Sequence, residues 1–181
     1  MQVLSLTYRN RYSEAFGFGL DSLRELGITI PAADRLPAEL DSQFNVLYRW
    51  LDRTDAADDL ARPELTDPTL LAASRLIQPV LSVAYFVADL EMHAWLSLEA
   101  LRIWLEHGPG RTLLGPTSHA AIANVELRGD YAAALDHQFD YLYRWLDHTD
   151  AADDLTRPEL TDPTLLAVTR LTEAVMTGVA G

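Results

Sequence analysis

Residues 66–90 read TDPTLLAASRLIQPVLSVAYFVADL and have the pattern of a long apolar helix with a clear start. Asp67 can accept hydrogen bonds from the free amides of a first helical turn, and Pro68 suits the first helical position because it has no N–H to satisfy there. The apolar residues that follow lie nearly all round the helix, and Pro79 is expected to kink it. The pattern predicts a helix that lies between other helices rather than on the surface.

The rest of the chain also has the periodicity of helices. Apolar residues recur at steps of three and four over 12–26, 40–51 and 91–107, and more weakly over 117–128. Strand signals are scarce, and only 27–31 (GITIP) looks extended. We therefore expect an all-α protein of stacked antiparallel helix pairs, a tetratricopeptide-like α-solenoid with seven or eight helices.

Part of the sequence occurs twice. Residues 40–80 and 135–175 align at a shift of 95 positions with 31 identities in 41. Since helical repeats usually recur at about 34–47 residues, the copied unit spans more than one helix pair. We expect 1–128 to form a helical repeat region and 129–181, a partial second copy, to pack as terminal helices of the same domain. The second copy breaks off early, which favours self-association or docking against the first copy through Leu165, Leu166, Leu171 and Val175.

Composition and charge narrow the classes of function. The 181 residues contain 49% hydrophobic and 23% charged residues, as in ordinary globular proteins, and no cysteine for disulfides or thiol chemistry. The formal net charge of −13 argues against nucleic acid as a partner. Residues 52–67 and 147–162 carry −4 and −5 of it. The longest apolar run, from Leu76, is too short for a bilayer and no leader opens the chain, so we expect a cytoplasmic protein with no membrane partner.

Three stretches carry a resemblance to a known family: LTYRNRYSEAFGFGLDSLRELGITIP (6–31), LARPELTDPTLLAASRLIQPVLSVAYF (60–86), and WLSLEALRIWLEHGPG (95–110) followed by LRGDYAAAL (127–135). In this order they resemble the helical region of multidomain STAND-type signalling ATPases. In that family an AAA-like ATPase module and a tetratricopeptide-like array are fused to serine/threonine and histidine kinases. The resemblance implies a regulatory segment without catalysis or cofactor, which acts on a protein partner or a neighbouring signalling module. It stops at Leu135, where the repeat of residues 40–80 begins.

Clustered aspartates form the candidate interaction surface. They follow each copy of the helix expected at 40–51, and they are Asp55, Asp58, Asp59, Asp150, Asp153 and Asp154. Hard cations take several carboxylates, but Ala57 and Pro63 occupy the glycine and glutamate positions of an EF-hand loop. We therefore expect a solvated acidic surface rather than a metal site. The surface supports an alternative function, a small acidic inhibitor or immunity-like protein that binds a basic protein partner; a metal-dependent hydrolase is a third alternative.

The remaining candidates favour structural roles, so no enzyme is expected. GRTLLGPT (110–117) has the glycine spacing of a phosphate loop, but Pro116 stands where the lysine would be, and the stretch reads as a turn between helices. Large rings beside leucines at helical spacing usually lock helices together, which predicts core packing for Trp50, Tyr48, Trp145 and Tyr143. The histidines have no metal-ligand spacing; they are His93, His107, His119, His137 and His148.

Overall fold

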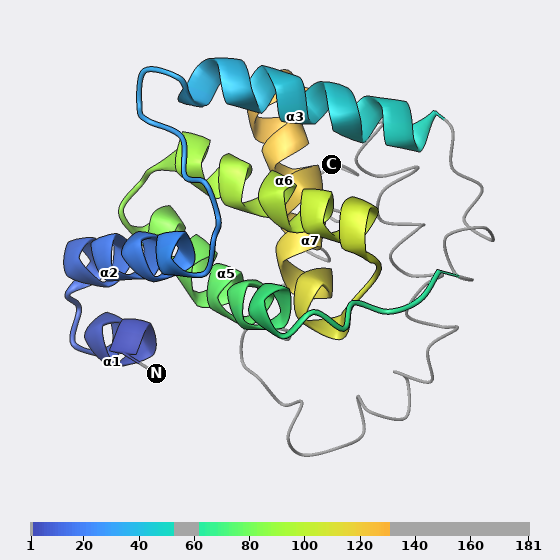
Figure 1. The fold of residues 1–181 in the computed structure, drawn as a ribbon. Helices are drawn as coiled ribbons and strands as arrows, with labels where there is room; N and C mark the ends of the chain where they lie inside the picture. Colours follow the sequence, from blue (N-terminus) through green and yellow to red (C-terminus); the bar gives the residue numbers. More distant parts are fainter. Residues whose placement is uncertain (1, 53–61, 131–181) are drawn as a thin grey trace, which may run out of the picture.

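A computed structural model of the chain describes residues 2–52 and 62–130 (Figure 1). Within these ranges the protein has six helices and no strand, which confirms the all-α prediction. The helices are α1 (Gln2–Tyr8), α2 (Tyr12–Glu25), α3 (Leu36–Leu51), α5 (Pro68–Phe86), α6 (Leu90–His107) and α7 (Arg111–Arg128). The solenoid, the count of seven or eight helices and the second-copy unit at 129–181 stay predictions.

The helix α5 begins as the sequence predicts. Asp67 is its N-cap, and the carboxylate accepts hydrogen bonds from the amides of Thr69 and Leu70, each at 2.9 Å. The helix continues through Pro79 and packs against α1, α2, α6 and α7. The predicted position between neighbouring helices is therefore confirmed.

By length and composition alone, α5 would also pass for a membrane-spanning helix, contrary to the expectation from its longest apolar run. In the described part of the chain it is the one helix with this profile, and 39% of the apolar stretch is buried by other helices. A core helix of a soluble protein has the same profile, so this feature decides nothing about location.

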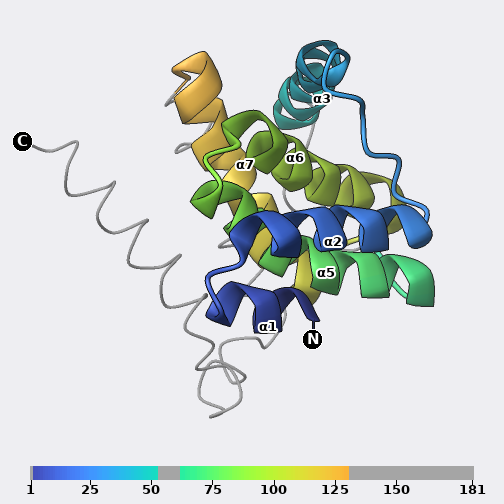
Figure 2. The same ribbon diagram turned by 90° about the vertical axis from the view of Figure 1, so that its left-hand side faces the viewer.

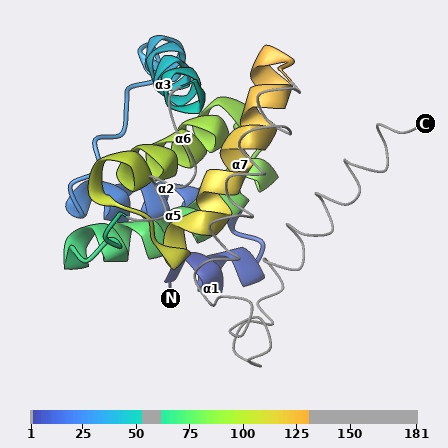
Figure 3. The same cartoon turned by 90° about the vertical axis from the view of Figure 1, so that its right-hand side faces the viewer.

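The helices α5 and α6 form the centre of the molecule. Helices α1 and α2 cover α5, α3 covers α6, and α7 crosses both central helices (Figures 1 and 2). The principal contacts of α3 are with α6 rather than with α2, the helix that precedes it. Figure 3 shows the C-terminal end of α7 rising toward the level of α3. The two sequence-distant helices α3 and α7 thus approach each other above α6.

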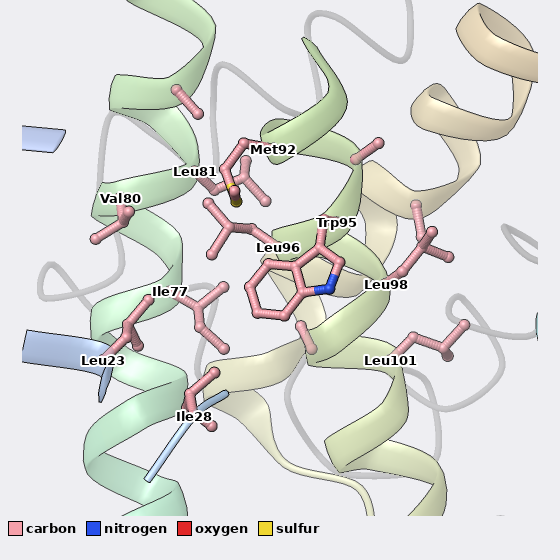
Figure 4. Close-up of a cluster of buried hydrophobic side chains, with 14 of the residues drawn as sticks. Leu23, Ile28, Ile77, Val80, Leu81, Met92, Trp95, Leu96, Leu98 and Leu101 are labelled. Carbon is pink, nitrogen blue, oxygen red and sulfur yellow. The ribbon is translucent and has the colours of Figure 1, made fainter. Parts of the chain in front are cut away.

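The core is densest around α6, where every residue from Met92 to Leu101 is buried. Figure 4 shows side chains of α5 and α6 meeting in this cluster, with Trp95 near its centre. Trp95 and Trp104 are both among the largest fully buried side chains. A helix buried on nearly all sides must have neighbours on nearly all sides, which explains the central place of α6.

Two sequence-based expectations were wrong at the level of elements. The short helix α1 was missed, because seven residues give too little periodicity to detect. The stretch 110–117 is not a turn: α7 begins at Arg111, six residues before the predicted start, and continues through Gly115 and Pro116. The packed tertiary environment overrides the weak local propensity here, because Leu113, Pro116 and Thr117 are all buried. A side chain at Gly115 would crowd the Gln78 amide on α5, so glycine permits this contact.

Candidate functional site

The acidic interaction surface predicted from the sequence lies outside the described residues. This applies to Asp55, Asp58, Asp59, Asp150, Asp153 and Asp154, and also to the apolar residues Leu165, Leu166, Leu171 and Val175. The surface and the self-association stay predictions. Two neighbouring acids are described: Asp52 follows the last residue of α3, and Asp67 caps α5.

The described residues contain a row of five aromatic rings from four helices, which we call the ring chain. Tyr12 stacks on Phe86 with ring centroids 5.0 Å apart, and Phe86 meets Tyr85 edge to face at 6.3 Å. Tyr85 lies 6.2 Å from His93, and His93 meets His119 edge to face at 5.3 Å. These separations are typical of interacting aromatic pairs.

Local structure at the helix ends brings the rings together. Tyr12 opens α2, Tyr85 and Phe86 close α5, and His93 lies in the first turn of α6. The connection between α5 and α6 is tight: Ala88 has a φ of 57°, and the Asp89 amide donates to the Ala84 carbonyl at 3.1 Å.

Asp89 then starts the next helix by accepting a hydrogen bond from the Met92 amide at 3.0 Å. An acid at an N-cap satisfies an amide that has no partner within the helix. The sharp turn and the cap together place the last turn of α5 beside the first turn of α6.

The ring chain runs from solvent to the interior. Tyr85 and Phe86 are 61% and 59% exposed, whereas His93 is only 3% exposed. Leu90, on the first turn of α6, adds another exposed apolar side chain. The outer end of the chain therefore presents aromatic surface to water, and its inner end lies between α6 and α7.

The two histidines at the inner end are neutral near pH 7. Burial lowers the pKa of His93, and burial together with the charge of His93 lowers the pKa of His119 to about 4. His93 Nδ1 and His119 Nε2 are buried and make no hydrogen bond. Burial thus favours the neutral form of both imidazoles, which pack edge to face between α6 and α7.

A second buried polar cluster lies between α3 and α6. The Glu99 carboxylate, 4% exposed, accepts two hydrogen bonds from Arg102 at 2.8 and 2.7 Å. Gln43 of α3 donates to the same carboxylate at 3.4 Å. The hydrogen bond to Glu99 raises the pKa of Arg102. Because the carboxylate is held by a paired arginine, the cluster is an ion pair that fixes packing rather than a free acid.

The contact between α3 and α7 includes an aromatic hydroxyl. Tyr48 OH donates to Asn124 Oδ1 at 2.7 Å, and burial raises the pKa of Tyr48. Tyr48 and Trp50 are partly buried and pack against the core, as predicted. Their second-copy counterparts, Tyr143 and Trp145, lie beyond the described ranges.

Sequence reasoning missed the ring chain because its members meet only in three dimensions. His93 and His119 are 26 positions apart on separate helices, a spacing without meaning in any metal or catalytic motif. In the two described ranges, no group of three or more metal-ligating side chains gathers at one place. Comparisons with protein-family models, characterised proteins and solved structures found no match to the chain.

Proposed function

We propose that this chain is a non-catalytic helical-repeat scaffold for protein–protein interaction or regulation, related to the sensory arm of a signalling ATPase or kinase. The observation that carries the proposal is the outer end of the ring chain. Tyr85 and Phe86 form an exposed aromatic surface, and Tyr12 stacks on Phe86 from another helix. Exposed aromatic clusters mark protein-binding surfaces more often than scattered apolar residues do.

The chemistry of the described interior also supports a scaffold. The buried carboxylate of Glu99 is held by Arg102, and burial lowers the pKa of both inner histidines. In this proposal the protein acts in the cytoplasm without a cofactor, and its helices present a surface to a protein segment.

The alternative, a small acidic inhibitor that binds a basic effector, is favoured by one observation. The two repeated acidic stretches, 52–67 and 147–162, carry −9 of the net charge of −13. Such a protein would meet its partner through charge, so association would be fast and sensitive to salt.

One capture experiment separates the two functions. The full-length protein and its Phe86→Ser and Tyr8→Ser variants serve as baits in lysate of the source cells, at low and high salt. Tyr8 is the matched control, because it is an exposed ring on α1 outside the ring chain. The scaffold proposal expects partners that Phe86→Ser loses at least about tenfold, as for loss of a central aromatic anchor, while Tyr8→Ser keeps them.

Partners that all baits retain at low salt and lose at high salt would favour the acidic inhibitor instead. Micromolar binding of ATP to the intact protein, measured by calorimetry, would contradict both functions.

A further inference from the structure

The surface that α3 covers is built from two helices that follow it in the sequence, α6 and α7. On α6, Glu99 accepts a hydrogen bond from Gln43, and on α7, Asn124 accepts one from Tyr48. Arg128, at the end of α7, pairs with Asp41 and lies over the Phe44 ring at 4.9 Å. We call this surface of α6 and α7 the α3 seat.

The segment that follows α3 in the sequence extends the same surface. Arg62 donates to the carbonyls of Trp104 and Leu105 at 3.1 and 2.6 Å and so caps the C-terminal end of α6. The amide of Leu65, a buried residue, donates to the Pro109 carbonyl at 2.8 Å. The α3 seat therefore holds both an apolar helix face and a polar extension.

The second copy repeats every residue that makes these contacts. All four buried α3 residues within the copied region, Leu40, Gln43, Phe44 and Leu47, are unchanged as Leu135, Gln138, Phe139 and Leu142. The contacting residues Asp41, Tyr48, Arg62 and Leu65 also recur, as Asp136, Tyr143, Arg157 and Leu160. Between 40 and 52 the copies differ only at Ser42 and Asn45, which are exposed, and at Val46, which is partly buried.

The copied part of α5 shows the opposite pattern. Three of its differences fall on buried positions: Ala73, Ser74 and Ile77 become Val168, Thr169 and Thr172. A valine in the space of a fully buried alanine overpacks the core, and a threonine in place of isoleucine brings a hydroxyl into it. The second copy has thus kept every buried α3 residue of the copied region, whereas three of the four buried positions in the copied part of α5 have changed.

The residues that form the α3 seat occur only once in the sequence, and the seat lies close to the chain on either side: α3 contacts it, and residues 131–146 follow α7 closely in the sequence. Residues 90–128, which form it, have no second copy in this sequence. The helix α7 ends beside Asp41 and Phe44, and Tyr48 meets α7 one turn earlier, at Asn124, so α3 crosses α7 near its C-terminal end (Figure 1). Gly129 closes α7 in a left-handed conformation, and residue 131 corresponds to Leu36, the first residue of α3. The segment 131–146, which corresponds to α3, therefore follows within a few residues of Arg128, one of the residues that form the seat.

We infer that the α3 seat is a binding site with two exclusive occupants, α3 and residues 131–146 of the same chain. Both use the same partner atoms on Glu99, Asn124 and Arg128, so occupation by one excludes the other. When 131–146 takes the seat, the apolar face of α3 is released. The inference rests on the repeated contact residues and is independent of the partner in the proposed function.

A double-substitution cycle in the full-length protein tests the exchange. Phe44→Ala, Phe139→Ala and the double variant are compared with the parent by thermal unfolding. In the double variant both occupants lack the ring, and the melting temperature is expected to fall by about 10 °C. The melting temperature of Phe44→Ala alone is expected to fall by less than half as much, because the intact second copy replaces α3. The melting temperature of Phe139→Ala alone should change little. Equal falls for Phe44→Ala and the double variant would overturn the inference.

Cross-linking gives a second measurement that does not depend on stability. The chain has no cysteine, so Asn124→Cys can be combined with Tyr48→Cys or with Tyr143→Cys and treated with a short bismaleimide. If the two segments exchange within one chain, we expect both cysteine pairs, 48 with 124 and 143 with 124, to give cross-linked protein at the monomer mass. Cross-linking of the Tyr48 pair alone, or of the Tyr143 pair only between chains, would overturn the inference.

Discussion

Gly108 shows how one residue determines the path of the chain. It ends α6 with a φ of 107°, a region that residues with a side chain rarely adopt. A Cβ at this position would also collide with the carbonyl oxygen of Pro63, where the segment 62–65 crosses the end of α6. The backbone conformation and the close crossing both require glycine.

Replacing this glycine should therefore destabilise the protein. Gly108→Ala is expected to lower the free energy of unfolding by more than about 2 kcal/mol, measured by urea denaturation. The matched control is Gly17→Ala on the exposed face of α2, where a Cβ meets no atom within 4 Å. This change should raise the free energy of unfolding by about 0.5 kcal/mol, because alanine favours a helix over glycine. Similar effects of the two substitutions would contradict the structural account.

The buried histidines make stability depend on pH. An unfolded histidine titrates near 6.5, whereas His119 in the folded protein has a pKa of about 4. Between these pH values the unfolded chain binds more protons than the folded protein, so the free energy of unfolding falls as the pH drops through this window. Above about pH 6.5 the full free energy of unfolding is retained.

His119 alone should lower the free energy of unfolding by about 2 kcal/mol between pH 7.5 and pH 5. Urea titrations at the two pH values measure this loss. His119→Leu is expected to remove most of it, and the control His107→Gln, at an exposed position, should retain it. A loss of the same size in His119→Leu would assign the pH dependence to other groups.

At the scale of elements, side chains satisfy the ends of the central helices. Asp67 and Asp89 accept hydrogen bonds from first-turn amides of α5 and α6. Near the C-terminal end of α6, the Trp104 carbonyl accepts a hydrogen bond from Arg62, which lies 42 positions earlier in the sequence. Helix starts are thus fixed by neighbouring residues, while this helix end depends on a distant one.

Removing the distant cap should weaken α6. Arg62→Ala is expected to lower the free energy of unfolding by about 1–2 kcal/mol, because two carbonyls at a helix C-terminus lose a charged donor. Arg75→Ala on the exposed face of α5 is the control and should stay within about 0.5 kcal/mol of the parent protein. Chemical denaturation of both variants measures the difference, and equal effects would contradict a capping role for Arg62.

At the scale of the whole molecule, α5 and α6 form a centre that the other helices cover. The exposed end of the ring chain lies at the junction of α2, α5 and α6, and the α3 seat lies on α6 and α7. One surface is proposed for a partner protein and the other for alternative segments of the same chain. In this arrangement, exchange on the seat changes the cover of α6 while leaving the helices that carry Tyr12 and Phe86 in place.

Much of the fold could be predicted from residues close together in the sequence. The cap at Asp67 and the apolar stripe from Leu40 to Leu51 each act over a few positions, so α5 and α3 were found. The start of α7 was missed because its glycine and proline argue locally for a turn, and only burial against other helices makes the segment helical. The candidate site was not predictable, because the members of the ring chain come from four helices.

The amino-acid sequence alone was enough to predict that the described protein is helical and where α2, α5 and α6 begin, because capping and periodicity are properties of neighbouring residues. It also showed that one stretch is repeated and which positions differ. The tertiary structure was needed to show that α3 lies on α6, that His93 meets His119, and that the α3 residues that contact the seat are unchanged in the second copy. An apolar stripe predicts that a helix face is buried, but it does not predict which helix covers that face, because the hydrophobic effect is not directional.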